Sequence, residues 1–320
     1  MKTRYTSSAS SAAPAAPAAA GTAAAIHKPR NPRRFAAEVP WWGKIAAKVI
    51  LARLPLDYRI WKQLHLFQHG TMEEPGYAHQ VFKNHFDVVR SRRALDSFVG
   101  LELGPGDSLL SAMVAQSYGA SAYHLVDVEA HAQADLKRYG AMADFLTERG
   151  LPTLDMKRMT TAEAVLTACR ATYGTSGLSS LRAIPDKSVD FIWSHTVLQH
   201  IKRAEFMETM RELRRVLRVD GISSHWVDLE DLLGGALNNL RFRESVWESS
   251  VMAKSGFYTN RIRYAEMLDM FKEAGFEPEV VQVKRWDRLP TPRSKLWERF
   301  RNLPDNELCV RCFHAVLRPT

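Results

Sequence analysis

The sequence predicts an α/β domain built on a doubly wound, mainly parallel β-sheet. From about residue 93 onward, strand-like apolar segments alternate with helix-like segments, which is typical of parallel sheets covered by helices. A glycine turn at residues 101–110 ("LELGPGDSLL") follows the first of these strands, as in many nucleotide-binding folds. With 320 residues, of which 46% are hydrophobic, the chain is long enough for one large domain with appendages.

The expected strands are rich in β-branched and aromatic residues. They span residues 97–103, 122–129, 189–194, 221–229, 279–286 and 308–317. The expected helices carry apolar residues three and four positions apart, as Phe206, Met210 and Leu213 do. They span residues 108–119, a long stretch that ends at Gly150, 205–218 and 264–275.

The chain before residue 93 has a different character. Residues 1–36 are Ala-, Pro- and Ser-rich with basic flanks, and such a composition cannot bury enough apolar surface to become ordered, so we expect a disordered tail. Residues 37–92 begin with a basic, tryptophan-rich amphipathic pattern, which predicts a helical segment that packs on the domain as a lid. The stretch Trp41–Leu66 also suits a helix lying in a membrane interface, so a peripheral membrane contact stays open.

Composition limits the compartment and the partners. No window approaches the ~20 apolar residues of a spanning helix, and three cysteines are too few for a disulfide framework. We therefore expect a cytoplasmic protein, either free or at the inner membrane face. Cys309 and Cys312 have no second cysteine pair to complete a metal site, so no metal is predicted. The formal charge is +9, but much of the basic excess precedes Glu38, which argues against a nucleic-acid partner for the domain.

The glycine turn itself points to a ligand. Gly104 and Gly106 allow a sharp turn and a close approach of the backbone, but Leu109 stands where a dinucleotide fingerprint has its third glycine. Glu102 before the turn would repel a pyrophosphate and attract an ammonium group. Asp127, at the end of the second strand, is placed to bind ribose hydroxyls. These features together favour S-adenosylmethionine.

Residues 95–285 resemble class I S-adenosylmethionine-dependent methyltransferases. The resemblance rests on four segments in the family's order: "GLELGPGDS", "LVDVE", "IPDKSVDFIWSHTVLQHI" and "RELRRVLRVDGISSHWVDL". It implies that residues 93–320 form a Rossmann-like, seven-stranded, mostly parallel sheet with a C-terminal antiparallel strand, preceded by the N-terminal helical extension. It implies cofactor contacts from Glu102, Gly104, Gly106, Asp107, Asp127, Val128 and Ser194. The acidic residue that often contacts adenine has no clear counterpart, and only Thr175 or Ser176 offers a polar group there.

Catalytic candidates follow the fourth and fifth expected strands. Methyl transfer to a hydroxyl group needs the two partners held in line and a proton removed, and an imidazole has a suitable pKa for that. His195, His225 and Asp228 are the candidate catalytic residues, and we expect His200 to be structural. Catalysis by proximity alone, without a strong base, stays open.

Residues 229–262 form an insert where this family commonly places elements that cover the substrate. Asn239, Arg241, Tyr258 and Arg261 within it are candidate contacts to the acceptor. The insert and the segment before the domain resemble those of bacterial methyltransferases of glycan or small-molecule biosynthesis, so we expect methyl transfer to an oxygen of a sugar, a glycan or another small molecule. The alternatives are a nucleic-acid or lipid/quinone methyltransferase, or a membrane-peripheral scaffold without enzymatic activity. Nothing in the sequence indicates an oligomeric state.

Overall fold

The computed structural model describes residues 42–43, 71–132 and 135–320. The chain divides into two units, residues 1–39 and residues 40–320, and everything described here belongs to the second. The predicted disordered tail, residues 1–36, and nearly all of the predicted interfacial stretch Trp41–Leu66 lie outside the described residues. Among the described residues, no helix is long and apolar enough to cross a membrane.

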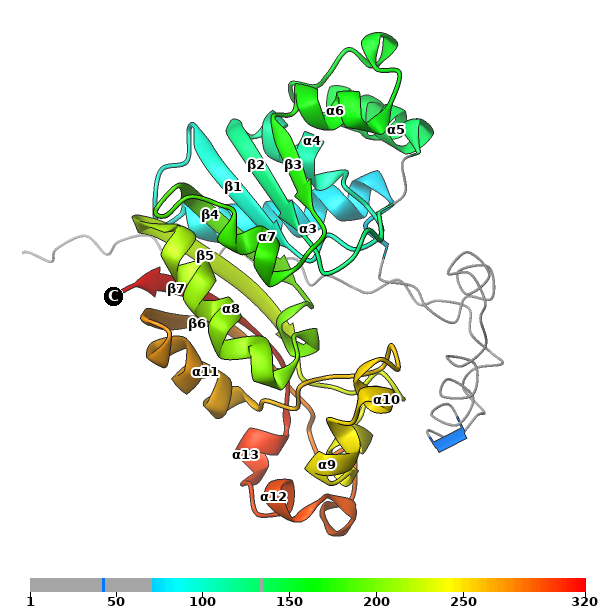
Figure 1. The fold of residues 1–320 in the computed structure, drawn as a ribbon, viewed down its shortest axis with the longest axis vertical. Coiled ribbons are helices and arrows are strands. Elements are labelled where there is room, and N and C mark those ends of the chain that lie inside the picture. Colours follow the sequence, from blue (N-terminus) through cyan, green and yellow to red (C-terminus); the bar gives the residue numbers. More distant parts are fainter. Residues whose placement is uncertain (1–41, 44–70, 133–134) are drawn as a thin grey trace, which may run out of the picture. The chain divides into compact units, whose positions relative to one another are not determined.

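A seven-stranded sheet forms the centre of the second unit, in the order β3-β2-β1-β4-β5-β7-β6 (Figure 1). Strands β1 to β5 are parallel, and β7 runs antiparallel to both of its neighbours. This confirms the predicted mostly parallel sheet with a C-terminal antiparallel strand. The strands are β1 Phe98–Leu103, β2 Ala120–Val126, β3 Ala171–Gly174, β4 Val189–His195, β5 Leu217–Asp228, β6 Phe276–Arg285 and β7 Val310–Pro319.

Helices cover both faces of the sheet, and each face has its own hydrophobic core (Figure 1). The first core joins the sheet to α3 Pro75–Arg90, α4 Ser111–Ser117, α5 Leu136–Thr147 and α6 Ala162–Ala168. The second joins it to α7 Leu178–Arg182, α8 Arg203–Val216 and α11 Tyr264–Glu273. This two-sided covering is the doubly wound arrangement that the alternating pattern predicts.

Helix α3 is an integral part of the first core. Its apolar residues at helical spacing, including Phe82, Phe86 and Val89, are fully buried against the sheet and α4. The predicted boundary at residue 93 therefore does not separate α3 from the domain, because this helix supplies one layer of the core. The predicted lid concerns the part of residues 37–92 that the structure does not describe.

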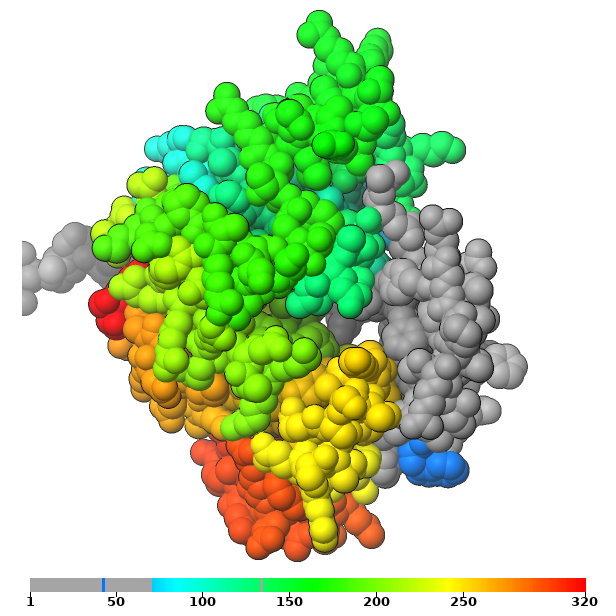
Figure 2. Space-filling view, viewed as in Figure 1, coloured from blue at the N-terminus to red at the C-terminus, as the bar shows by residue number. Residues whose placement is uncertain are grey.

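The insert after β5 packs against the connection between β6 and β7, which the sequence analysis did not identify as part of this region. The insert contains α9 Glu244–Trp247 and α10 Ser250–Ala253, and the connection between β6 and β7 contains α12 Glu298–Arg301 and α13 Asp305–Leu308. A small core joins the two connections, and Figure 2 shows them as one continuous surface, yellow against orange-red. The members of this core are Leu237, Leu240, Leu296, Phe300 and Leu308. The cap beside the sheet is therefore built from two inserts.

Candidate active site

The glycine turn leaves β1 in a conformation that requires glycine. Gly104 has φ 74° and Gly106 has φ 66°, in the left-handed region that L side chains rarely adopt. A Cβ atom on Gly104 would lie 2.5 Å from Val197 Cγ2, so a side chain at this position would collide with the segment that follows β4. The turn therefore brings bare backbone to the carboxyl ends of β1 and β4, where ligands bind in such sheets.

Asp127 connects the glycine turn to the end of β2. Its Oδ2 accepts a hydrogen bond from Gly106 N at 3.0 Å, and its Oδ1 accepts one from Val128 N at 2.7 Å. Gly177 N donates to the backbone oxygen of Asp127, and a Cβ atom on Gly177 would lie 3.4 Å from Val128 Cγ1. Val128 is 68% exposed, so an acid and an apolar surface stand side by side at this strand end.

Glu102 is turned into the protein interior. Its carboxyl accepts a hydrogen bond from Ser111 Oγ and another from Tyr123 OH at 3.3 Å. Burial raises the pKa of Glu102 to about 8, and the nearby charge of Asp127 adds to the shift. At neutral pH the carboxyl is mostly protonated, so the attraction for an ammonium group that the sequence predicts requires Glu102 to ionise first.

Ser194 and His225 form a pair on the second-core side of the sheet. They are register partners on β4 and β5, and Ser194 Oγ lies 2.7 Å from His225 Nδ1. Burial lowers the pKa of His225 to about 3. Neither side chain has exposed surface through which it could contact a ligand. The complete burial of Ser194 and His225 does not fit the roles predicted for them, cofactor binding and catalysis.

His195 ends β4 on the other face of the sheet and is only partly buried. Its ring stacks on Trp226 of β5 at a centroid distance of 6.0 Å, and its Nδ1 lies 3.2 Å from His85 Nε2. The next residue, Thr196, has φ 57°, which is unusual for a β-branched side chain. Backbone strain of this kind clusters at functional sites. Thr196 redirects the chain from β4 into the 3-10 helix η2, Leu198–His200.

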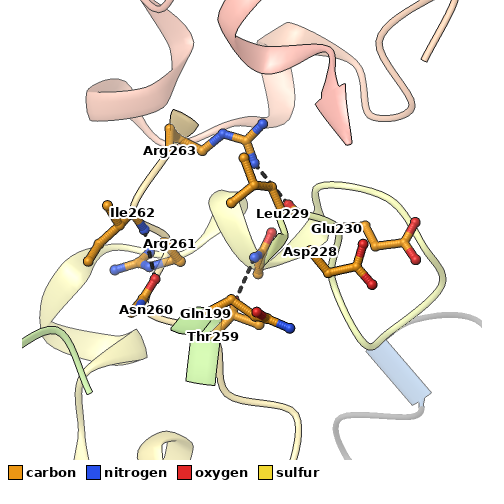
Figure 3. A pocket seen from close by; sticks show the side chains of 10 residues that line it. Gln199, Asp228, Leu229, Glu230, Thr259, Asn260, Arg261, Ile262 and Arg263 are labelled. Carbon is orange, nitrogen blue, oxygen red and sulfur yellow. Dashed lines mark hydrogen bonds between the residues drawn. The ribbon is translucent and has the colours of Figure 1, made fainter. Parts of the chain in front are cut away.

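A small polar pocket lies beyond the ends of β4 and β5 (Figure 3). Its wall comes from η2, from the start of the insert and from the segment before α11. The lining residues are Gln199, Asp228, Leu229, Glu230, Asn239, Thr259, Asn260, Arg261, Ile262 and Arg263. Asn260 holds the wall together, since its Nδ2 donates to Leu198 O at 2.8 Å and to Ile201 O at 3.0 Å.

Several polar atoms of this wall are buried without a hydrogen-bond partner among the described residues. They include two acceptors, Gln199 Oε1 and Asn239 Oδ1, and two donors, Arg261 Nε and Arg263 Nε. Leaving such atoms unpaired costs about 1–3 kcal/mol each. Arg261 also has φ 57°, so backbone strain occurs a second time at the pocket. These unpaired atoms are enclosed by the protein, so the partly exposed Asp228 and Glu230 are the acidic groups of the lining that a ligand can reach.

The pocket is lined by some, but not all, of the catalytic and acceptor-binding residues predicted from the sequence. Asp228, Asn239 and Arg261 line it. Tyr258 OH instead donates to Glu248 Oε2 at 2.7 Å, inside the insert. Arg241 Nε donates to Asn238 Oδ1 at 3.0 Å, and Arg241 does not line the pocket.

The sequence reading missed three parts of this region. Gln199 precedes His200 in the "VLQH" segment, and this position next to a candidate histidine was the available signal. His200 itself lies with Nδ1 2.9 Å from Tyr258 O and ties η2 to the insert, in keeping with a structural role. Arg263 reaches the pocket while donating to backbone oxygens of β7 and α13. His85 occupies a core-facing position of α3, three residues after Phe82, and that helical spacing was the available signal.

Comparison with known families identifies the domain. Residues 101–224 match the family model of a methyltransferase domain. These residues run from the glycine turn to the middle of β5. This stretch of the chain is a methyltransferase domain. Its methyl donor is S-adenosylmethionine, as the sequence predicts.

Solved structures also align with this methyltransferase. Protein YcgJ of Bacillus subtilis is 17% identical, with 73% of this chain and 96% of that chain covered at a TM-score of 0.39. An S-adenosylmethionine-dependent methyltransferase of Mesorhizobium loti is 14% identical, with 73% and 97% covered at 0.39. The 1,6-didemethyltoxoflavin-N1-methyltransferase of Burkholderia thailandensis is 12% identical, with 86% and 89% covered at 0.43. No curated protein matches the sequence.

Proposed function

We propose that this methyltransferase transfers the methyl group to a hydroxyl oxygen of a small polar acceptor, of the kind a sugar or glycan presents, bound in the pocket beyond β4 and β5. The polar lining of this pocket, with the partly exposed acids Asp228 and Glu230, is the observation that carries this proposal. A hydroxyl group donates one hydrogen bond and accepts others, so neighbouring hydroxyls of the acceptor can donate to the partly exposed carboxyl groups of Asp228 and Glu230.

The cofactor fits at the glycine turn. Gly104 and Gly106 would receive the methionine part against bare backbone, since a Cβ atom on Gly104 has no room. Asp127 would bind the ribose hydroxyls, and the exposed side chain of Val128 would pack on the adenine ring. Asp107 follows directly in the turn and is buried beside it. When bound, S-adenosylmethionine supplies a methyl group on a sulfonium, which needs only a nucleophile held in line.

Two side chains would prepare the acceptor. His195, at the end of β4, would take the hydroxyl proton as the oxygen attacks. Asp228 lies two residues after Trp226, the register partner of His195, so it belongs to the same face of the sheet one step nearer the strand end. Because Asp228 also lines the pocket, it would orient the acceptor through hydrogen bonds.

The character of the wall separates this proposal from its alternatives. A lipid or quinone acceptor would need an apolar lining, whereas this wall carries two arginines, two asparagines, a glutamine and two acids. A nucleic-acid acceptor would need contacts to phosphates around the site, which make affinity fall steeply with salt.

The direct test is transfer of a labelled methyl group. The full-length protein is incubated with radiolabelled S-adenosylmethionine and separate pools of neutral sugars and glycosides, carboxylic acids, lipids and RNA. We expect label in the sugar and glycoside pool as a methyl ether that resists mild base. Label confined to lipid or RNA would overturn the proposed acceptor class, and absence of S-adenosylhomocysteine binding by calorimetry would overturn the cofactor site.

Two neighbouring asparagines provide a matched pair of variants. Asn239→Ala removes a side chain that lines the pocket, whereas Asn238→Ala removes a buried amide that bonds Arg241 outside it. We expect Asn239→Ala to raise the acceptor KM about tenfold or more, the value of one hydrogen bond to a group left unpaired. Asn238→Ala is expected to leave KM within a factor of about two. Equal effects of both substitutions would remove the pocket from the proposal.

A further inference from the structure

A row of hydrogen-bonded side chains leads from His195 into the interior of the first core. His195 Nδ1 lies 3.2 Å from His85 Nε2, and His85 Nδ1 lies 2.8 Å from Ser224 Oγ. Ser224 Oγ in turn lies 2.8 Å from His314 Nε2. We call these four residues the histidine row. Its three inner members are almost wholly buried, with exposures of 2% for His85, 0% for Ser224 and 6% for His314.

The histidine row joins parts of the chain that are far apart in sequence. His85 comes from α3, Ser224 from β5 and His314 from β7. Aromatic rings enclose it: Trp193 lies 5.2 Å from the His85 ring, and Trp226 lies 5.8 Å from the His314 ring. One helix and two strands thus place neutral hydrogen-bonding groups behind His195, at the end of β4.

The hydroxyl of Ser224 couples the proton positions along the histidine row, so that two arrangements are possible. It has one proton, so it can donate to only one of its two imidazole neighbours and must accept from the other. If it donates to His314, then His85 donates Nδ1–H to Ser224 and accepts at Nε2 from His195 Nδ1–H. In that arrangement the protonated nitrogen of His195 faces inward and Nε2 keeps its lone pair. In the opposite arrangement His195 Nε2 carries the proton and cannot act as a base.

We propose that His85, Ser224 and His314 are positioning residues that hold His195 in the tautomer with Nδ1 protonated, so that its Nε2 can take the acceptor proton. This inference rests on the proposed function, in which His195 is the general base. The arrangement follows the logic of a catalytic base whose far nitrogen is held by a buried partner. Here the partner is a neutral imidazole in place of a carboxylate, and a serine and a second imidazole hold that partner in turn.

The surroundings keep the inner imidazoles neutral. Burial lowers the pKa of His85 well below its usual value, with the rings of His314, His195 and His225 adding to the effect. Burial and the nearby guanidinium of Arg92 lower the pKa of His314 to about 4. A neutral row can only donate or accept hydrogen bonds, and it polarises cooperatively when a charge forms at one end.

The proton step balances within the site. The oxygen lone pair of the acceptor forms the new bond to the methyl carbon, and the carbon–sulfur bond breaks with its electron pair left on sulfur. The hydroxyl proton moves to His195 Nε2, which makes His195 an imidazolium. Its Nδ1–H then donates a stronger hydrogen bond to the neutral Nε2 of His85. The proton leaves from His195 Nε2 to water after the product departs.

The test reads the tautomer directly and needs no acceptor. Histidine ring nitrogens of the isotope-labelled, full-length protein are observed by NMR with S-adenosylhomocysteine added, and the His195 signals are assigned from their loss in His195→Gln. We expect a protonated-type shift for Nδ1 and an unprotonated-type shift for Nε2. The reverse pattern in the wild-type protein would overturn the proposal.

Two consecutive serines of β5 supply the variant and its control. Ser224→Ala interrupts the histidine row. Ser223→Ala makes the same change at an equally buried serine that bonds His225 Nε2 on the other face of the sheet. We expect the His195 nitrogens of Ser224→Ala to show a mixture of both tautomers, and those of Ser223→Ala to match the wild type. Identical spectra for both variants would show that the row does not control His195.

Kinetics distinguish this inference from the proposed function. With the acceptor found by methyl labelling, Ser224→Ala is expected to lower kcat about tenfold and to shift its pH profile, with the acceptor KM nearly unchanged. Ser223→Ala is expected to retain kcat within about twofold. If the wild type methylates a hydroxyl and Ser224→Ala and Ser223→Ala have the same kinetics, the inference about the histidine row fails while the proposed function stands. If no hydroxyl is methylated, the proposed function fails, and the NMR pattern still reports on the row.

Discussion

Replacing Glu102 with glutamine should stabilise the protein at alkaline pH. The carboxyl is 2% exposed and accepts hydrogen bonds from Ser111 and Tyr123. Burial raises its pKa from 4.5 to about 8, so the group enters the fold in its protonated form. Glutamine has nearly the shape of the protonated acid and does not ionise. Glu102→Gln therefore keeps the packing and removes the titration.

The sign and size of the effect follow from proton linkage. Between pH 4.5 and about pH 8 the unfolded chain has released the Glu102 proton while the folded protein still holds it. The folded state then binds more protons, so this group lowers the free energy of unfolding as the pH rises through that window. At about 1.4 kcal/mol per pKa unit, the full shift corresponds to about 5 kcal/mol above pH 8. The loss is absent in Glu102→Gln.

Urea denaturation of both proteins at several pH values between about 5 and 9 measures this difference. The stability of Glu102→Gln relative to the wild type should grow by several kcal/mol from the acidic to the alkaline end. Glu277→Gln, at an exposed position of β6, controls for the loss of one carboxylate from the chain. A difference between wild type and Glu102→Gln that stays constant across the pH range would refute the reasoning.

Three further substitutions test the site. Gly104→Ala should weaken S-adenosylhomocysteine binding in calorimetry, and adding Val197→Ala should restore part of it, because the new Cβ atom meets Val197. If the second change restores nothing, backbone strain at φ 74° is the whole effect. Asp127→Asn should weaken the same binding about 10- to 100-fold, and an unchanged affinity would exclude a ribose contact. Asn260→Ala should lower the free energy of unfolding by about 1–3 kcal/mol in urea, since it leaves the buried Leu198 oxygen unpaired.

Six of the seven strands were located from the sequence, whereas the four-residue β3, Ala171–Gly174, was not among the expected strands. A buried parallel strand is a short apolar run, and the glycine turn marks which strand comes first. Helix α3 was not assigned to the domain, since it precedes the first strand and its apolar stripe contacts elements more than 100 residues away, such as Trp193 on β4. Only the fold shows that Phe82 and Trp193 share one core. Local periodicity identifies such a helix but does not say which surface it covers.

At the site, the sequence indicates candidate residues but not their protonation states. Asp127 and the glycines are visible because a turn and a strand end require them. Glu102 carries the same kind of signal, yet its pKa depends on burial beside Ser111 and Tyr123, which are nine and 21 positions away. The sequence predicts a negatively charged Glu102 that attracts a ligand. In the fold, burial keeps this carboxyl mostly protonated at neutral pH.

The "SSHW" segment of β5 shows why the histidine row was beyond sequence reasoning. Successive side chains of a strand point to opposite faces, so Ser223 and Ser224 enter different cores although they are chemically identical. Ser223 meets His225, and Ser224 meets His85 and His314. The sequence indicated both His225 and His195 as candidates and favoured His195, because it directly follows the strand. The parity of the strand separates them, because only His195 stands on the face where three other elements supply partners.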